Sequence, residues 1–309
     1  MTIPNKIHTN ANQISSKRSL SSVLLDYFIL IKPSIILLLL ITTVPAMILA
    51  SEPGSLPSIN LILATLLGGI LAAGGAGSVN MYIDRDIDKI MSRTLSRPVP
   101  SERVSAKSAL TLGIIMAIAA GVWLELSVNT FTAILSVSAF LYYIIIYSLL
   151  LKRYTVHNTV LGGIAGAAPP LIGWVAVTGE IGWVGIILFI VVFTWQPAHF
   201  WALALGLAED YKKAGIPMLP VVRSETETKG QTLAWSMLTF VVTMGLGIAA
   251  ELGTIYFIVA IIGGGGFIYV CWQLFRTPGI TKAPLVFRYS TIYLAVLFAA
   301  IALDRILMS

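Results

Sequence analysis

Three residues with oxygen-bearing side chains lie at helical spacing near the end of an apolar stretch. Asn80, Asp84 and Asp88 are each four residues apart, so a helix that continues through them places all three on one face. Two carboxylates one turn apart repel each other unless a cation lies between them. Mg²⁺ commonly binds one or two carboxylates and completes its shell with water and substrate phosphate. The spacing predicts a catalytic face that includes Asn80, with Mg²⁺ bound by Asp84 and Asp88. It also predicts that Asp86 points away from this face.

Two arginines repeat the one-turn spacing a little further along the chain. Arg93 and Arg97 each carry a guanidinium group, which matches two phosphate oxygens in a bidentate hydrogen bond. Acidic residues followed by basic ones therefore predict a diphosphate site. In the alternative interpretation the carboxylates pair with neighbouring basic residues, and the arginines only orient the chain in the membrane.

A second polar segment follows the apolar stretch that contains His199 and Trp201. An ionisable side chain inside a membrane span is a functional candidate by default, although a histidine there can also be a hydrogen-bonded packing residue. Candidates for a second part of the site are His199, Trp201, Asp210 and Tyr211. Candidates for further diphosphate contacts are Lys152, Arg153, Lys212 and Lys213. In the alternative interpretation, Lys212 and Lys213 pair with Glu209 and Asp210. Lys152 and Arg153 would then only form a turn that orients the chain in the membrane.

Composition indicates that membrane helices position these residues. The chain has 309 residues, of which 57% are hydrophobic and 11% charged, whereas soluble domains carry roughly 25% charged residues. Long unbroken apolar runs exclude the alternation of a transmembrane barrel. We expect an all-α fold with nine transmembrane helices in a single membrane domain, 1–309. The predicted spans are 34–50, 60–80, 108–124, 130–151, 158–178, 183–205, 232–250, 254–275 and 287–306.

Basic residues predict how these helices are oriented. With a cytoplasmic N-terminus, all of the 20 Lys and Arg residues except Arg305 lie in the N-terminal tail or at the inner ends of the spans, as the positive-inside rule requires. The outer connections carry acidic residues instead, at Glu52, Glu125, Glu180 and Glu251. The net charge of +6 follows from this arrangement, so it does not indicate a nucleic-acid partner.

The orientation assigns each loop to one side of the membrane. Residues 1–26 are expected to form a cytoplasmic tail, and the C-terminus is expected outside. The segments 81–107 and 206–231 are long, polar and predicted to be cytoplasmic. Because binding and catalytic residues concentrate on such loops, we expect both to carry the active site.

The motifs resemble those of the UbiA superfamily of intramembrane prenyltransferases. The resemblance depends on Asn80-x-x-x-Asp84-x-x-x-Asp88, followed by Arg93-Thr94 and Arg97-Pro98, in a chain of nine spans. The segments from His199 to Ala204 and from Asp210 to Pro220 resemble the protoheme IX farnesyltransferase branch, whose product is heme O. The superfamily usually has a second Asp-x-x-x-Asp pattern after the sixth span. Here Asp210-Tyr211 stands in its place.

The resemblance implies an enzyme that transfers a farnesyl group from farnesyl diphosphate to a vinyl group of protoheme IX. Mg²⁺ as cofactor, with the basic candidates above, would stabilise the charge on the departing diphosphate. Candidates on the acceptor side are His199, Trp201, Asp210 and Tyr211. Aromatic candidates for lining the cavity are Tyr82, Tyr142, Tyr143, Tyr147, Trp195 and Trp201. The resemblance also implies a plasma-membrane protein in contact with the lipid bilayer, with a heme A synthase acting downstream.

Two other functions stay open. The first is a UbiA-type prenyltransferase for another acceptor, such as 4-hydroxybenzoate, a chlorophyllide or a glycerol ether lipid. The second is a transporter, which would carry polar residues near the bilayer midplane on discontinuous helices. In this sequence the charges gather at one predicted membrane face, which favours chemistry at a cytoplasmic mouth.

The predicted orientation can be tested by labelling single cysteines with an impermeant thiol reagent in intact cells, after Cys271 has been replaced. Cysteines at Ser55 and Gly179 should react, because both connections are predicted to lie outside. Cysteines at Ser96 and Ser224 should stay unlabelled until the cells are opened. Labelling at Ser96 from outside would contradict the orientation.

Overall fold

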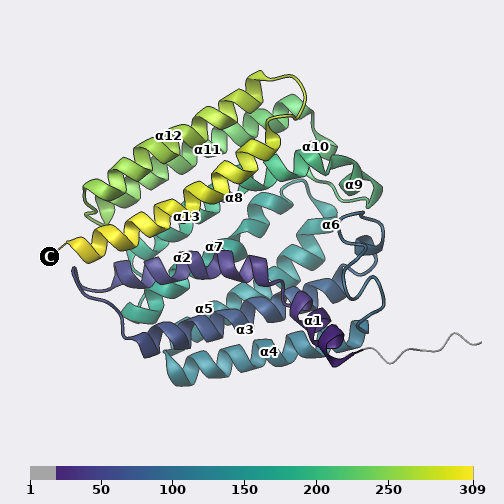
Figure 1. Ribbon diagram of the computed structural model, residues 1–309, viewed down its shortest axis with the longest axis horizontal. Coiled ribbons are helices and arrows are strands. Elements are labelled where there is room, and N and C mark those ends of the chain that lie inside the picture. The colour runs from purple at the N-terminus through teal and green to yellow at the C-terminus, as the bar shows by residue number, and fades with distance from the viewer. Residues whose placement is uncertain (1–18, 309) are drawn as a thin grey trace, which may run out of the picture.

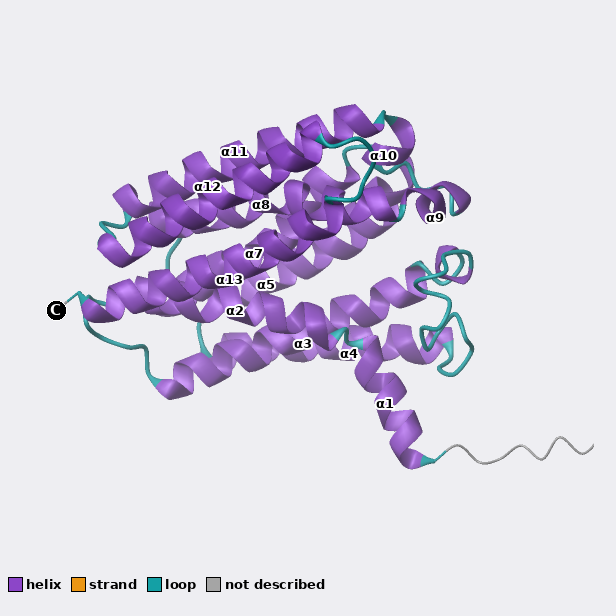
Figure 2. Cartoon of the chain, turned by 45° about the horizontal axis from the view of Figure 1, so that its top comes forward, coloured by secondary structure: helices purple, strands orange, loops and turns teal. Residues whose placement is uncertain are grey.

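The computed structural model describes residues 19–308, and these residues form helices and connections without a β-strand (Figure 2). Nine helical stretches in this part of the chain are long and apolar enough to cross a membrane, which confirms the predicted all-α fold. They are α2 (Pro33–Ala50), α3 (Ile59–Ile83), α4 (Ala106–Ser127), the continuous stretch Thr130–Tyr154, α7 (Asn158–Thr178), α8 (Trp183–Gly206), α11 (Glu225–Ala249), α12 (Thr254–Arg276) and α13 (Ala283–Leu307).

The fourth stretch is not a uniform α-helix. It begins as α5 (Thr130–Leu141), continues as a π-helix, η2 (Tyr142–Leu151), and ends as α6 (Lys152–Tyr154). Four short elements complete the chain: α1 (Leu20–Leu30), the 3₁₀ turn η1 (Ile87–Lys89), α9 (Ala208–Lys213) and α10 (Leu219–Val222).

Several helices extend beyond the apolar windows that predicted them. The seventh span was expected over 232–250, whereas α11 begins at Glu225. Its N-cap Ser224 accepts a hydrogen bond at Oγ from the backbone N–H of Glu227 at 3.1 Å, a favourable start for a helix. The first turn of α11 is polar, so hydropathy alone does not reveal it.

α1 overlaps the end of the stretch predicted as a tail and projects from the bundle (Figure 2). Its buried Asp26 accepts a hydrogen bond from Arg103 Nε at 2.8 Å, while Leu24 and Phe28 are exposed. The rest of the predicted tail, and the basic residues Lys6, Lys17 and Arg18, lie outside the described residues.

The long helices run side by side, with most polar connections gathered at one end (Figure 1). We call this the loop end; it comprises residues 84–105, 155–157 and 207–224. The described Lys and Arg residues lie at or near it, except Arg305, which donates hydrogen bonds to the carbonyl of Ser51 at the opposite end. The one-sided charge agrees with the predicted topology, although which side faces the cytoplasm stays a prediction.

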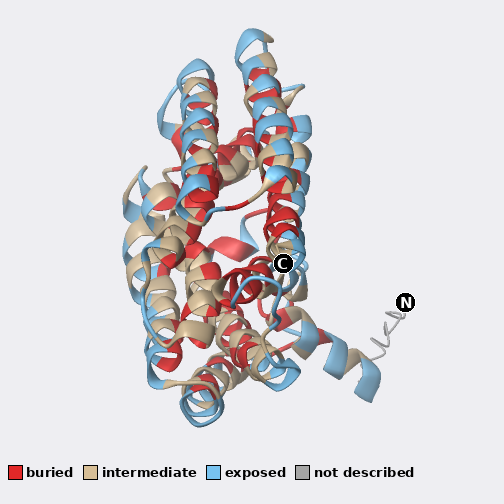
Figure 3. Cartoon of the chain, turned by 90° about the vertical axis from the view of Figure 1, so that its left-hand side faces the viewer, coloured by how far each residue is buried: buried red, intermediate tan, exposed pale blue. Residues whose placement is uncertain are grey.

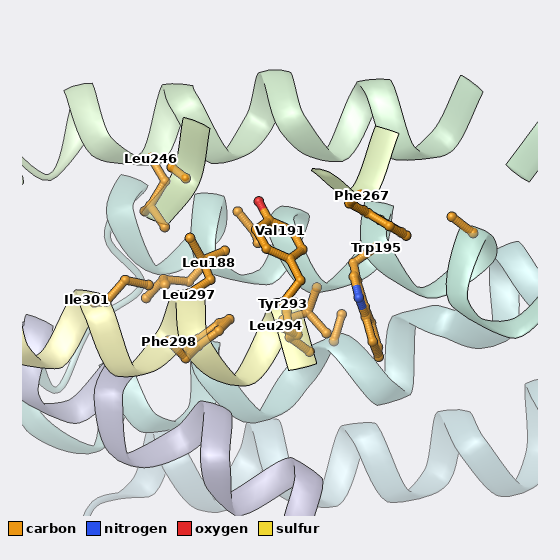
Figure 4. Packing of buried hydrophobic residues seen from close by; sticks show 14 of the residues in the cluster. Leu188, Val191, Trp195, Leu246, Phe267, Tyr293, Leu294, Leu297, Phe298 and Ile301 are labelled. Atoms are coloured by element: carbon orange, nitrogen blue, oxygen red, sulfur yellow. The ribbon is translucent and has the colours of Figure 1, made fainter. Parts of the chain in front are cut away.

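Apolar side chains lie on both the inside and the outside of the bundle. Exposed positions lie along the outer sides of the helices (Figure 3). Many of them are Leu, Ile or Val, as expected for helices that face lipid. The main buried cluster lies between α8, α11, α12 and α13 and includes Trp195, Phe267 and Phe298 (Figure 4). Because lipid is as apolar as the side chains, close packing and polar contacts hold these helices together, with little hydrophobic driving force.

The contact between α3 and α4 depends on small residues. A Cβ atom built at Gly75 would lie 2.8 Å from the carbonyl oxygen of Gly113, and one built at Gly113 would lie 2.7 Å from that of Gly75. The two backbones therefore approach as closely as glycine allows. This contact holds α3, whose end carries the predicted acidic face, against α4.

Replacing Gly75 by leucine should lower the melting temperature of the purified protein in detergent. The added side chain forces apart two backbones, and overpacking of this kind costs about 1–3 kcal/mol. The matched control is Gly265→Leu on α12, where a Cβ meets no atom within 4 Å. Equal melting temperatures for the two variants would contradict the role of Gly75.

Candidate active site

The end of α3 brings the predicted acidic face into the interior. Asn80, Asp84 and Asp88 are all buried. The backbone N–H of Asp84 donates to the carbonyl of Asn80, and that of Asp88 donates to the carbonyl of Asp84, each at 2.8 Å. The helix does not continue regularly through all three residues, because α3 ends at Ile83 and Asp88 lies in η1. Carboxylates are unfavourable at a helix C-terminus, and their distant partners hold them there instead.

Three cationic side chains from separate segments contact this acidic face. Lys152 Nζ donates to Asp84 Oδ2 at 2.5 Å, and Arg97 Nη1 donates to Asp88 Oδ2 at 2.8 Å. Lys32 Nζ donates to Asn80 Oδ1 at 2.6 Å. The structure thus brings together Asn80 and both carboxylates with two of the predicted diphosphate ligands. We call these six residues the acidic cluster.

Lys32 belongs to the acidic cluster, although the sequence analysis counted it only among the basic residues that predict the membrane orientation. It lies between α1 and α2 with φ 54° and ψ 62°, a left-handed conformation that is uncommon for any residue except glycine. Such a backbone persists only where the surroundings enforce it. Burial, together with the charges of Arg97 and Lys152, lowers the pKa of Lys32 to about 7, although the two carboxylates oppose this shift. The available signal was a lysine directly before the proline that begins the first span.

One oxygen in the acidic cluster has no partner. Asp84 Oδ1 is buried and unpaired, while Oδ2 accepts bonds from both Asn80 and Lys152. Within residues 19–308 no three His, Cys, Asp or Glu side chains form a metal cluster. A cation here would thus have two carboxylates and would need further oxygens from water or a bound anion, as Mg²⁺ commonly does. The free oxygen and the hard carboxylate donors fit that ion.

The π-helix forms one wall of the site. Ser148 Oγ accepts a hydrogen bond from Asn80 Nδ2 at 3.1 Å and donates to the carbonyl of Tyr143 at 2.9 Å. The rings of Tyr143 and Tyr147 lie 5.3 Å apart. The π-helix leads directly into Lys152, the first residue of α6. This stretch therefore supplies a hydroxyl to Asn80 and an ammonium group to Asp84. Segments of π-helix are rare and occur frequently at functional sites.

A mostly apolar cavity of about 400 Å³ begins beside the acidic cluster. It lies between α2, α3, the stretch α5–η2, α7 and α8. Lys32 contributes to both the cavity wall and the cluster, so the two regions are continuous. Of the aromatic candidates, Tyr143, Tyr147 and Trp195 line the cavity, whereas Tyr82, Tyr142 and Trp201 are not among its lining residues.

His199 also lines the cavity, as the middle ring of an aromatic stack. Its ring centroid lies 4.3 Å from that of Trp195 and 4.4 Å from that of Phe287. Nδ1 is 2.8 Å from Ser290 Oγ. Trp201 is buried away from the cavity, in an edge contact with Trp235 at 6.4 Å between centroids. The structure therefore separates two residues of α8 that the sequence grouped together.

The second polar segment packs against the first. Asp210 Oδ2 accepts a hydrogen bond from Ser92 Oγ at 2.6 Å, and Tyr211 packs in a small buried core with Ile87 and Met91. Burial raises the pKa of Tyr211, and the guanidinium of Arg93 opposes this rise. Arg93 therefore reaches the contact between the two loops. Asp210 and Tyr211 hold the loops together at the loop end.

The remaining basic candidates lie outside the acidic cluster. Arg153 donates to both carboxylate oxygens of Asp86 at 2.7 Å and holds the pKa of that carboxyl at about 2. The Asp86 side chain is 59% exposed, as expected from its spacing. Lys212 and Lys213 are exposed at the end of α9. Their role as diphosphate ligands stays a prediction.

Curated relatives match most of the chain. A protein named protoheme IX farnesyltransferase from Roseiflexus sp. is 45% identical over 92% of this chain, which spans about half (53%) of that protein. Another of the same name from Cutibacterium acnes is 44% identical, over 98% of this chain and 92% of that protein.

Solved structures share the fold at low sequence identity. A digeranylgeranylglyceryl phosphate synthase superimposes with a TM-score of 0.75 and 21% identity, covering 92% of this chain and 99% of that chain. A UbiA homologue from Archaeoglobus fulgidus bound to DMAPP and Mg²⁺ superimposes with a TM-score of 0.63 and 14% identity, covering 90% of this chain and 99% of that chain. The sequence model of the UbiA prenyltransferase family matches residues 39–301, and this chain therefore belongs to that family.

Proposed function

We propose that this chain transfers a farnesyl group from farnesyl diphosphate to a vinyl group of protoheme IX. The observation that carries the proposal is the acidic cluster at the mouth of an apolar cavity. The acidic cluster would bind a charged group and the adjoining cavity a long apolar group, and an isoprenoid diphosphate has both. The curated relatives named protoheme IX farnesyltransferase support this acceptor.

The charges of the acidic cluster favour a metal and a diphosphate together. The two carboxylates are matched by the cationic side chains of Arg97 and Lys152. Lys32 adds a further amino group, which a bound anion would keep protonated. Asp84 and Asp88 would hold Mg²⁺, and the free Oδ1 of Asp84 fits this role. The bound ion would supply electrostatic stabilisation of the leaving diphosphate. The UbiA homologue bound to DMAPP and Mg²⁺ supports this assignment by its fold.

The basic residues act where negative charge develops. Lys152 and Arg97 already lie at the carboxylates, so each can transfer a hydrogen bond to a diphosphate oxygen without a large movement. Donors held in place before the reaction stabilise the developing charge at low cost. Arg93, near the contact between the loops, is positioned to add a further hydrogen bond from the loop end.

The cavity wall protects the reactive end of the chain. Tyr143 and Tyr147 line the cavity beside the cluster, and aromatic faces attract cations. They would stabilise the allylic cation that forms when the carbon–oxygen bond breaks, and they would exclude water from it. The cation then adds to the vinyl group, and water adds to the resulting carbon with loss of one proton.

The acceptor would approach along α8. Trp195 and His199 line the cavity. Both faces of His199 are covered by Trp195 and Phe287, so a planar macrocycle would contact the edge of this stack. Asp210 and Tyr211 would act indirectly, by holding the two loops in contact over the mouth. We place the loop end in the cytoplasm and the protein in the plasma membrane, with a heme A synthase using the product.

Another acceptor is the competing proposal. A solved structure with the same fold is a digeranylgeranylglyceryl phosphate synthase, and a fold shared at 21% identity does not specify the acceptor. The relatives that share more than 40% identity favour protoheme over a phenolic acid or a lipid.

The acceptor can be tested with the purified protein. Given Mg²⁺, farnesyl diphosphate and protoheme, it should form a heme that is heavier by one farnesyl group and one hydroxyl group, as measured by mass spectrometry. The parallel reaction with 4-hydroxybenzoate should give no prenylated product. Prenylation of that acid, with protoheme unchanged, would contradict protoheme as the acceptor, although the chain would still be a prenyltransferase of this family.

Substituting the carboxylates tests the metal and diphosphate site. Asp84→Asn and Asp88→Asn should each lower turnover by at least about 100-fold, the scale of losing one strong electrostatic contact in a transition state. Both changes preserve volume, but each leaves a partly buried cation, Lys152 or Arg97, without its carboxylate. We therefore expect a lower melting temperature as well, and turnover is compared at a temperature at which each variant is folded.

The matched control is Asp86→Asn, which removes an exposed ion pair with Arg153. We expect its activity to stay within about 5-fold, since exposed pairs contribute little. Equal damage from all three substitutions would contradict the distinction between the buried carboxylates and Asp86.

A further inference from the structure

One face of α3 leads from the acidic cluster along the whole cavity. Starting at Asn80 and moving toward the N-terminus of the helix, the positions on this face are Ala76, Ala73, Gly69 and Thr65. All four line the cavity. Their spacing of three or four residues keeps them on one side of the helix. α3 therefore joins the site where a diphosphate would bind to the far part of the cavity.

Gly69 differs from the other glycines that line the cavity. A Cβ at Gly162 would collide with the ring of Tyr147, and one at Gly166 would lie 2.8 Å from Gln196 Oε1. A Cβ at Gly77 would lie 3.2 Å from the carbonyl oxygen of Leu30. At these positions glycine is required, because neighbouring protein atoms occupy the space that a side chain would need.

At Gly69 the nearest protein atom to a Cβ would be Leu40 Cδ2, at 3.9 Å. This is ordinary van der Waals contact, so packing of the protein does not require glycine here. A glycine in a helix interior costs about 1 kcal/mol relative to alanine. The missing side chain adds to the open space of the cavity, and a larger residue would fill that space.

The distance along α3 matches the length of a substrate. Gly69 lies eleven residues before Asn80, which is about three turns or ~16 Å of helix. An isoprene unit has four main-chain carbons, and its extended length is close to the ~5.4 Å pitch of a helix. Three units held by a diphosphate at the acidic cluster would therefore end near Gly69 and Leu40.

We propose that Gly69 sets the isoprenoid chain length, by leaving room for the third isoprene unit between α3 and Leu40 of α2. The inference rests on the proposed function, because it assumes an isoprenoid diphosphate anchored at the acidic cluster. A side chain at position 69 would occupy the place of the third unit and leave the first two unaffected. Geranyl diphosphate has two units and would still fit.

The test compares substrates of different length on the intact chain. For wild type and Gly69→Leu, kcat/KM is measured with geranyl and farnesyl diphosphates, protoheme and Mg²⁺. Binding of the non-reactive thiodiphosphate analogues is measured separately. Gly69→Leu should lower kcat/KM and affinity for the farnesyl compounds at least about tenfold, as expected for excess volume in an apolar pocket. The values for the geranyl compounds should stay within about twofold.

Two further variants make the result specific. Gly265→Leu on α12 adds the same side chain at an exposed helix position with no atom within 4 Å of its Cβ, and it should not change the preference. Gly69→Ala should shift the preference in the same direction as leucine but less, and it serves if the leucine variant does not fold.

The outcomes separate this inference from the proposed function. Equal loss with both diphosphates, or no loss with either, would overturn the role of Gly69. A wild-type protein that neither binds nor uses any allylic diphosphate would instead reject the proposed function. A preference for farnesyl that both Gly69 variants leave intact would place the length limit elsewhere.

Discussion

Two buried carboxylates at the end of α3 impose the main constraint on this structure. Asp84 and Asp88 are almost fully buried, and a charge buried beside a membrane is tolerated only when it is paired. Lys152 and Arg97 provide that pairing, from the end of the π-helix and from the first long loop. Lys32 adds a third amino or guanidinium donor, through its hydrogen bond to Asn80. The segments around the site must meet at this point because each supplies one of these partners.

The same constraint explains the irregular elements at the loop end. α3 stops at Ile83, so Asp84 lies at the helix C-terminus, where a carboxylate is unfavourable, and its contact with Lys152 offsets this cost. The π-helix presents Ser148 to Asn80, and Lys152, the residue that follows it, donates to Asp84. Lys32 adopts a left-handed backbone to reach inward. The polar contacts that these elements make offset the cost of their irregular backbones, as is common at functional sites.

The rest of the bundle keeps an apolar space open beside these charges. Helices in a membrane associate through close packing, as the glycine contact between α3 and α4 shows. On its other face α3 carries alanine, glycine and threonine toward the cavity. One helix therefore joins a tight helix contact, a charged site and the wall of an apolar cavity. This combination links the proposed chemistry to the proposed length of the substrate.

Local features of the sequence determined the membrane helices, the gathering of basic residues at one end and the spacing of Asn80, Asp84 and Asp88. These depend on apolar length and on residues four apart, so neighbouring positions are sufficient to predict them. The tertiary structure decided the partners. Lys32 lies 48 positions from Asn80, and Lys152 lies 68 positions from Asp84, so spacing could not reveal either contact. It also turned Trp201 away from the cavity and directed Asp210 to Ser92. Which charges meet depends on how distant helices pack, and that information is not local in the chain.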